Sequence, residues 1–175
     1  MYDSKTKELL DYGAYDYEYE CEQIPKKDGS LKSKRIRKYD YEETMVLVEK
    51  LLMTLIRENN IKMVFLEDVP SIRYSTAARQ LLRLQGALIA YLAKRGIPHE
   101  LVMPRAWQAK YKYKDKELTK EQKAYKRSVD KMNIRQTKKD SLLAVKKIFN
   151  MELDNDDLAD AILIGHYAVN YRLQK

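Results

Sequence analysis

The chain has 175 residues but only one cysteine, Cys21, and two histidines, His99 and His166. A single cysteine cannot form a disulfide within the chain or a zinc site of several cysteines, and it fits the reducing cytosol. Two histidines are too few for a metal site built on imidazole ligands. No apolar stretch is long enough to cross a bilayer, and the N-terminus lacks the apolar core of a signal peptide. We therefore expect one cytoplasmic globular domain over residues 1–175.

Positive charge is present in excess and is unevenly distributed. The net charge is +8, and residues 105–139 hold thirteen Lys or Arg against four acids, so the remainder carries about −1 (8 − 9). A basic insert at about 110–137 on an otherwise balanced chain favours a polyanionic partner, with nucleic acid as the first candidate. A solvated loop that only aids solubility is the alternative.

A second basic segment, residues 25–38, contains seven Lys or Arg around a proline and a glycine. We expect a flexible turn or hairpin tip that contacts phosphates, or an ordinary exposed loop. In the basic insert, tyrosine alternates with lysine over residues 111–114, which suits nucleic-acid contact. The residues expected to bind DNA are Lys34, Arg35, Arg37, Arg105, Lys112, Lys114 and Arg135.

The spacing of apolar residues predicts the secondary structure. Four segments have helical periodicity: residues 41–59, 75–94, 138–149 and 156–173. Segments 61–66 and 98–103 are typical of buried strands, and residues 15–22 alternate in the manner of a half-buried strand in which Cys21 packs beside a row of tyrosines. Because strands alternate with helices after residue 60, we expect a layered α/β sheet.

Acidic residues occur at two places where carboxylates are costly unless they bind something. Glu67 and Asp68 follow the strand at 61–66, and Asp157 and Asp160 lie three apart at the start of an apolar helix. That spacing puts both aspartates on one face, although such a pair alone is more often an ordinary solvated surface. Carboxylates suit Mg²⁺, and two such ions can assist phosphodiester hydrolysis. The pattern predicts a divalent-metal nuclease site formed by Glu67, Asp157 and Asp160.

Three further residues are expected to be structural. Asp68 points to the opposite face from Glu67 and suits a cap or turn contact. His166 fits a satisfied core or surface histidine better than a metal ligand. Trp107, after Pro104, should anchor a turn in the core, and stacking on an unpaired base is the alternative.

Several segments resemble those of RuvC-type Holliday junction resolvases, the phage-encoded branch above all, and they occur in the same order. They are Val64-Phe65-Leu66-Glu67-Asp68-Val69, Leu84-Gln85-Gly86-Ala87-Leu88, Val102-Met103-Pro104-Arg105-Ala106-Trp107 and Asp157-Leu158-Ala159-Asp160-Ala161-Ile162-Leu163-Ile164-Gly165. The resemblance implies an RNase H-like mixed sheet flanked by helices, a homodimer, dependence on Mg²⁺ or Mn²⁺, and structure-selective cleavage of branched DNA.

Carried over by the resemblance, Glu67 matches the family's strand-end glutamate, and Asp157 and Asp160 match its C-terminal aspartate pair. Lys138 or Lys139 matches its lysine near the scissile phosphate. The helix at 75–94 resembles the one that packs across the family's dimer interface.

One feature departs from the family pattern, which begins with a central strand ending in an aspartate. The segment Met1-Tyr2-Asp3-Ser4-Lys5-Thr6 instead resembles the end of the family's second strand. We therefore expect the fold to be N-terminally truncated and this chain to be unstable or inactive without that strand.

The sequence thus predicts a magnesium-dependent endonuclease for branched DNA in a bacterial or phage-infected cell. The alternatives are a non-catalytic branched-DNA-binding module that keeps the fold without the first catalytic aspartate, and an RNA-directed RNase H-like nuclease.

Overall fold

The structure is a computed structural model that describes residues 1–14, 19–27, 29–69, 76–112 and 118–173. The chain forms two compact units. One comprises Met1–Ala14, Val64–Pro70 and His99–Lys175, and the other comprises Tyr15–Met63 and Ser71–Pro98. No helix in the described part of the chain is long and apolar enough to cross a membrane. The prediction of one domain over residues 1–175 remains a prediction.

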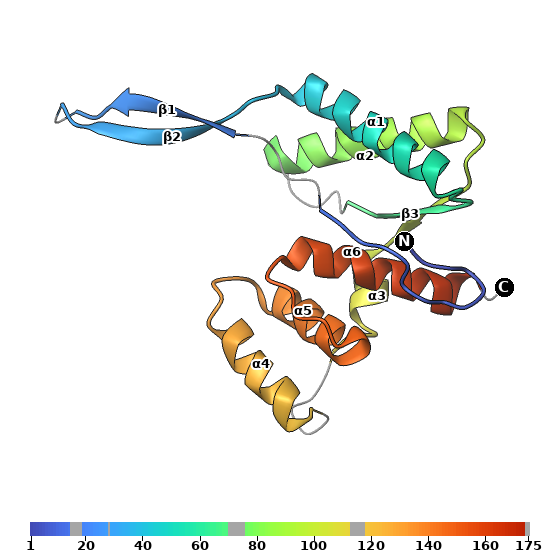
Figure 1. The fold of residues 1–175 in the computed structure, drawn as a ribbon. Helices are drawn as coiled ribbons and strands as arrows, with labels where there is room; N and C mark the ends of the chain where they lie inside the picture. The colour runs from blue at the N-terminus through green and yellow to red at the C-terminus, as the bar shows by residue number, and fades with distance from the viewer. Residues whose placement is uncertain (15–18, 28, 70–75, 113–117, 174–175) are drawn as a thin grey trace. The chain divides into compact units, whose positions relative to one another are not determined.

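The second unit begins with an antiparallel hairpin of β1 (Tyr19–Pro25) and β2 (Leu31–Arg37), drawn in blue in Figure 1. A hydrogen bond of 2.7 Å from the Lys26 amide to the Ser30 carbonyl closes its turn. The predicted hairpin tip is therefore confirmed, and residues 15–18 of the predicted strand lie outside the described residues. The expectation that Cys21 packs beside tyrosines is wrong, because Cys21 is exposed on a strand that pairs, among the described strands, with β2 alone.

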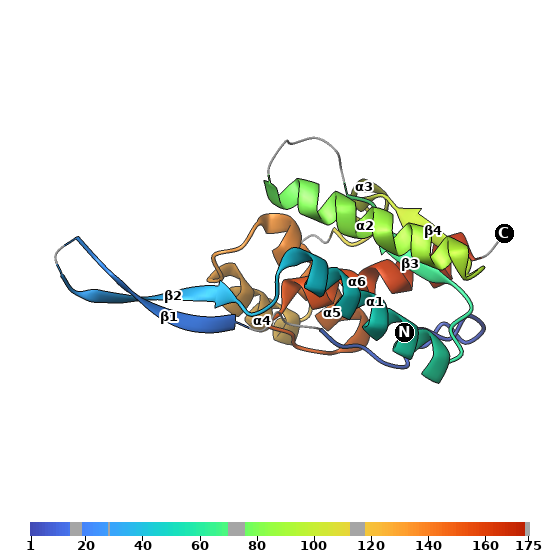
Figure 2. The ribbon, with the colours of Figure 1, turned by 90° about the horizontal axis from the view of Figure 1, so that it is seen from above.

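Helices α1 (Tyr41–Glu58) and α2 (Thr76–Lys94) complete this unit and lie side by side in both views (Figures 1 and 2). A capping box starts α1: the Asp40 side chain accepts a hydrogen bond from the Glu43 amide, and the Glu43 side chain accepts one from the Asp40 amide. This reciprocal cap satisfies two of the amides that a helix start leaves unpaired. Both predicted helices are thus confirmed.

The first unit contains the parallel pair β3 (Val64–Glu67) and β4 (His99–Val102), in which Glu67 is opposite Val102. The chain then forms α3 (Pro104–Gln108), α4 (Lys120–Asp130), α5 (Gln136–Phe149) and α6 (Asp156–Tyr167), and α6 continues as a π-helical turn at Ala168–Arg172. The mixed α/β fold is confirmed. The described strands form two separate two-stranded sheets, however, where one mixed sheet was expected.

The core of this unit lies around α5 and α6. Its fully buried side chains include Trp107, Leu142, Val145, Ala159 and Leu163, each 0% exposed. Helix α4, which was not predicted, folds the centre of the basic insert against α5, with Val129 buried. Its signal in the sequence is the capping box of Thr119 and Gln122. The basic insert is therefore in part a packed helix.

The N-terminal residues of the chain pack against α6 through Tyr2. The Tyr2 hydroxyl donates a hydrogen bond of 2.8 Å to the Ile162 carbonyl, and the ring lies against Phe149 and His166. This approach needs the glycine at position 165, because a Cβ there would be 2.5 Å from Tyr2 Cε2. His166 lies among these rings and shares a hydrogen bond of 2.8 Å with the Tyr111 hydroxyl. Burial lowers the pKa of His166, which fits the structural role expected for it.

The contact between Tyr2 and Gly165 gives a first prediction. Gly165→Ala should lower the free energy of unfolding by about 1–3 kcal/mol, because the added methyl group displaces the Tyr2 ring and its hydrogen bond. Urea unfolding followed by circular dichroism measures this loss. Gly86→Ala in α2 is the matched control, because an added Cβ there has no described atom within 4 Å, and it should be neutral or stabilising. An equal loss in both variants would contradict the assigned packing.

Candidate active site

Two helix starts place a lysine opposite a group of acids. Asn155 caps α6 by accepting a hydrogen bond of 2.9 Å from the Leu158 amide, and Asp156 and Asp157 occupy the first turn. Acids are favoured at this end because the helix dipole is positive there. Asp160 follows one turn later, on the side of α6 that faces α5. Lys138 lies in the first turn of α5, so the packing of the two helices brings its ammonium group to the α6 acids.

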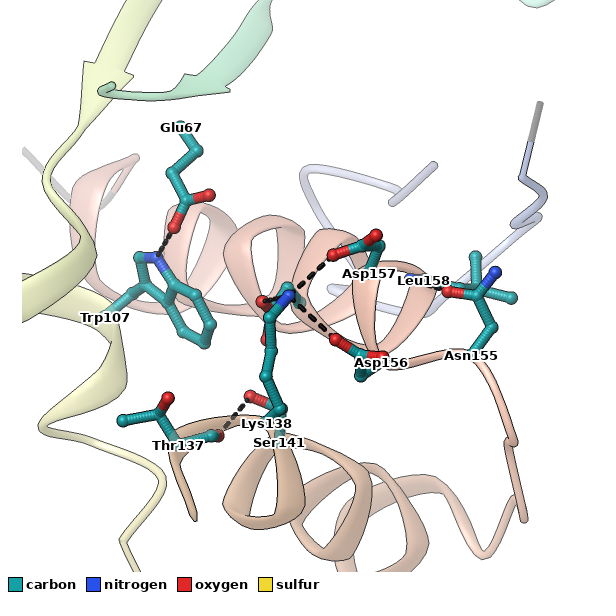
Figure 3. A network of polar contacts seen from close by, with 10 residues as sticks. Glu67, Trp107, Thr137, Lys138, Ser141, Asn155, Asp156, Asp157 and Leu158 are labelled. Carbon is teal, nitrogen blue, oxygen red and sulfur yellow. Dashed lines mark hydrogen bonds and ion pairs between the residues drawn. The ribbon is translucent and has the colours of Figure 1, made fainter. Parts of the chain in front are cut away.

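The Lys138 ammonium group is the centre of this cluster (Figure 3). Its Nζ lies 2.6 Å from Asp157 Oδ1, 2.7 Å from Asp160 Oδ2 and 3.0 Å from Asp156 Oδ2. Burial opposes the charged form of the amine, but the three carboxylates outweigh this effect and raise the pKa of Lys138. We call Lys138, Asp156, Asp157 and Asp160 the acid cluster. Asp156 was not among the predicted residues, because only the spacing of the other two aspartates suggested a shared helix face.

The three carboxylates differ strongly in their exposure to solvent. The Asp157 side chain is 88% exposed, whereas that of Asp160 is 10% exposed. Asp160 Oδ2 accepts a hydrogen bond from Lys138, but Asp160 Oδ1 is buried and has no hydrogen-bond partner among the described atoms. A buried, unpaired carboxylate oxygen is costly, and a cation beside it would remove that cost. Asp160 Oδ1 is therefore the oxygen of the acid cluster with an acceptor position to spare.

Glu67 extends from the end of β3 and is held in place by Trp107. The Trp107 Nε1 group donates a hydrogen bond of 3.1 Å to Glu67 Oε1 (Figure 3). Glu67 is only partly exposed at the end of β3, and the partial burial of its carboxyl group raises its pKa. The hydrogen bond from Trp107 opposes this rise, and the charge of Asp160 adds to it. Glu67 therefore lies within electrostatic reach of the acid cluster.

Trp107 serves two purposes in this arrangement. Its ring is fully buried, so the prediction that it anchors the turn after β4 is confirmed. Its hydrogen bond to Glu67 was not predicted, because the two residues are 40 positions apart and only the pairing of β3 with β4 brings α3 to the end of β3.

The residues suit a divalent cation in kind, since Mg²⁺ binds carboxylate oxygens and Asp160 Oδ1 is unpaired. Among the described residues, however, no group of three His, Cys, Asp or Glu side chains is arranged to hold a metal ion. Glu67, Asp157 and Asp160 remain the predicted ligands. In this conformation the cation that the α6 acids share is Lys138.

The remaining predicted residues near this site lie apart from the acid cluster. Lys139 Nζ donates a hydrogen bond of 2.7 Å to the Asp130 carbonyl, so Lys138 is the lysine of this pair that reaches the acids. The Asp68 amide donates a hydrogen bond of 2.9 Å to the Val102 carbonyl and thereby extends the β3–β4 ladder.

Of the residues expected to bind DNA, Arg105, Lys112 and Arg135 are exposed. Lys34, Arg35 and Arg37 lie on β2, but their side chains are outside the described part, as is all of Lys114. Helix α4 adds an exposed row of cations that we call the α4 stripe: Lys120, Lys123, Arg127 and Lys131. At 100° per residue these positions fall within about 80° of one another, opposite the buried Val129. None of the four forms an ion pair with a described residue.

Comparisons by sequence give no match, either to a protein-family model or to a curated protein. By structure, the chain is similar to Thermus thermophilus RuvC in complex with Holliday junction substrate, with a TM-score of 0.50, 12% identity, and coverage of 87% of this chain and 86% of that one. A second T. thermophilus RuvC structure has a TM-score of 0.49 and 15% identity, with 86% of each chain covered. The fold is mixed α/β. Its arrangement resembles that of RuvC.

The raised pKa of Glu67 leads to a second prediction. Because the folded protein holds the Glu67 proton more tightly than the unfolded chain, ionisation lowers stability as pH rises above the usual pKa of glutamate, about 4.3. Glu67→Gln cannot ionise and still accepts the Trp107 hydrogen bond. This variant should therefore be more stable than the wild type at pH 7, and the difference should vanish below about pH 4.

Urea unfolding between pH 4 and pH 8 measures this difference. Asp68→Asn is the matched control at the next position, because Asp68 makes no hydrogen bond or ion pair with the acid cluster among the described residues. A Glu67→Gln protein that is less stable than the wild type at pH 7 would show that the Glu67 charge supports the fold.

Proposed function

We propose that this chain is a metal-dependent endonuclease that cuts Holliday junctions and related branched DNA. The observation that carries the proposal is the acid cluster, in which three α6 carboxylates surround one cation position within electrostatic reach of Glu67. The RuvC-like fold supports it, since the T. thermophilus RuvC that the chain resembles was solved with a Holliday junction substrate.

Each residue of the site has a proposed task. Glu67, Asp157 and Asp160 hold Mg²⁺ or Mn²⁺, with Asp160 Oδ1 as the oxygen already free to bind. A bound divalent ion would activate water and stabilise the leaving oxygen of the phosphodiester. Lys138, or its neighbour Lys139, steadies the phosphate that is attacked. Trp107 keeps the Glu67 carboxylate oriented through its hydrogen bond.

We further propose that DNA arms lie along the basic surfaces. The exposed residues Arg105, Lys112 and Arg135 and the α4 stripe supply cations without a described acidic partner, and phosphates would satisfy them. The basic β1–β2 hairpin would hold another part of the junction. A cytoplasmic homodimer, in which α2 packs across the interface, is proposed from the family resemblance, since a junction offers two symmetric strands to cut.

Loss of single acids tests the catalytic part. Glu67→Gln and Asp160→Asn should lower the rate of Mg²⁺-dependent cutting of a four-way DNA junction by at least about a hundredfold, because each removes an anionic oxygen from the metal site. Affinity for the junction should remain largely unchanged. Gel assays of cutting and of binding measure both quantities. Asp154→Asn, an exposed acid before the Asn155 cap, is the matched control and should cut normally.

Two results would contradict this assignment. Loss of junction binding together with cutting would show that the acids support the fold. Faster cutting of an RNA–DNA hybrid than of the four-way junction would favour the RNase H-like alternative.

The second candidate function is a branched-DNA-binding module without catalysis. The observation in its favour is that no three acidic side chains in the described part are arranged to hold a metal ion. The 175-residue chain is tested for binding and for cutting of a labelled four-way junction in Mg²⁺ and in Mn²⁺. Junction binding without cutting in either metal would support the binding module.

The α4 stripe gives a separate prediction about salt. The stripe is about 16 Å long, a length over which one DNA strand presents about five phosphates. Exchange of all four of its cations for glutamine should reduce the slope of log affinity against log salt by about 3–4, at about 0.9 per lost phosphate contact. Fluorescence anisotropy of a labelled junction at several salt concentrations measures the slope.

The matched control exchanges four exposed cations outside the proposed DNA-binding surfaces and outside α2 for glutamine: Lys5, Lys50, Arg57 and Lys62. The slope should change little in this control. An equal reduction in both variants would mean that the protein binds DNA through its net charge and not through the α4 stripe.

A further inference from the structure

We propose that Lys138 is the internal counter-ion of the acid cluster in the metal-free protein, and that a divalent cation must displace its ammonium group to bind. This inference rests on the proposed metal-dependent function and adds an order of events to it. Lys138 first neutralises the acids and becomes available to a phosphate only after an ion has taken its place.

The distances within the acid cluster fit an ammonium group better than a metal ion. The carboxylate oxygens lie 2.6–3.0 Å from Lys138 Nζ. Oxygens around Mg²⁺ lie at 2.0–2.1 Å, so a set gathered around an ammonium group is wider than a set gathered around a metal ion. This width agrees with the absence, among the described residues, of three acids placed to hold one ion. The acids are already assembled, but around a larger cation.

Lys138 leaves both the charges and the hydrogen bonds of the acid cluster incompletely balanced. Three carboxylates and one ammonium group leave a formal charge of −2 (1 − 3) in the acid cluster. An ammonium group donates at most three hydrogen bonds, and Lys138 has three carboxylate partners. It therefore leaves Asp160 Oδ1 buried and unpaired. A divalent cation in place of the ammonium group would reduce the charge of the site to −1 (2 − 3) and could also bind this oxygen, which Lys138 leaves unpaired.

The exposure of the side chains allows the Lys138 ammonium group to be displaced. The Lys138 side chain is 27% exposed, and Asp157, its closest partner, is 88% exposed. Lys138 has a long, flexible stem that starts in the first turn of α5, so its ammonium group can move into solvent without unfolding the helix. An ion can approach from the same side, past Asp157. Once released, Lys138 remains beside the acids as a cation for an incoming phosphate.

The test is the affinity for Mg²⁺ alone, measured by isothermal titration at constant ionic strength without DNA. Lys138→Met removes the competing cation and keeps a similar stem. It should bind Mg²⁺ with a Kd lower than that of the wild type by about tenfold or more, since one charged hydrogen bond is worth that much. Without metal, its melting temperature should be lower than that of the wild type, and added Mg²⁺ should raise it by more.

Lys147→Met is the matched control on the same helix, because Lys147 lies in the last turn of α5, at the opposite end from Lys138. Its Mg²⁺ affinity should be that of the wild type. Asp160→Asn should weaken Mg²⁺ binding both in the wild type and in the Lys138→Met background.

The outcomes separate this inference from the proposed function. Equal or weaker Mg²⁺ binding by Lys138→Met would overturn the displacement and leave the metal-dependent nuclease intact. No Mg²⁺ binding by either protein would overturn both. If Lys138→Met does not fold, the wild type still decides the question through the NMR signal of the Lys138 ammonium group. That signal should change with the same midpoint as Mg²⁺ binding, and an unchanged signal at saturating Mg²⁺ would refute the displacement.

Discussion

The packing of α5 against α6 brings one lysine and three aspartates together, and the rest of the site depends on this contact. On the core side the two helices bury apolar side chains such as Leu142 and Leu163. At their N-terminal ends the same contact places Lys138 among the acids. Apolar burial is not directional and supplies stability, whereas the ion pairs join Lys138 to particular carboxylates of α6.

The acid cluster lies at the boundary between a dry core and solvent, which gives similar groups different properties. Asp160 is buried and has an unpaired oxygen, Asp157 is largely exposed, and Glu67 is partly buried and held by an indole N–H. In such a setting the charged forms of the acids are costly unless a cation is close. The fold itself thus leaves the negative charge of the acid cluster incompletely neutralised.

Much of the fold was predictable from sequence periods, because long amphipathic helices and capping residues are local signals. Helix α1, for example, begins after Asp40 as its capping pattern indicates. The separation of the strands into two small sheets was not predictable, since pairing of strands is a long-range choice. The packing of α4 against α5 was missed because its apolar face is narrow and the positive charge of the insert dominates its composition.

The sequence by itself determined the kinds of residue at the candidate site: a strand-end glutamate, two aspartates three apart on an apolar helix, and a lysine at the start of the preceding helix. Spacing along one helix is enough to place Asp157 and Asp160 on one face. Only the tertiary structure decided that Asp156 joins them, that Trp107 holds Glu67, and that Lys138 occupies the cation position. These contacts join residues that are 18 to 40 positions apart in the sequence. Whether such residues meet depends on how the elements pack and not on any local pattern.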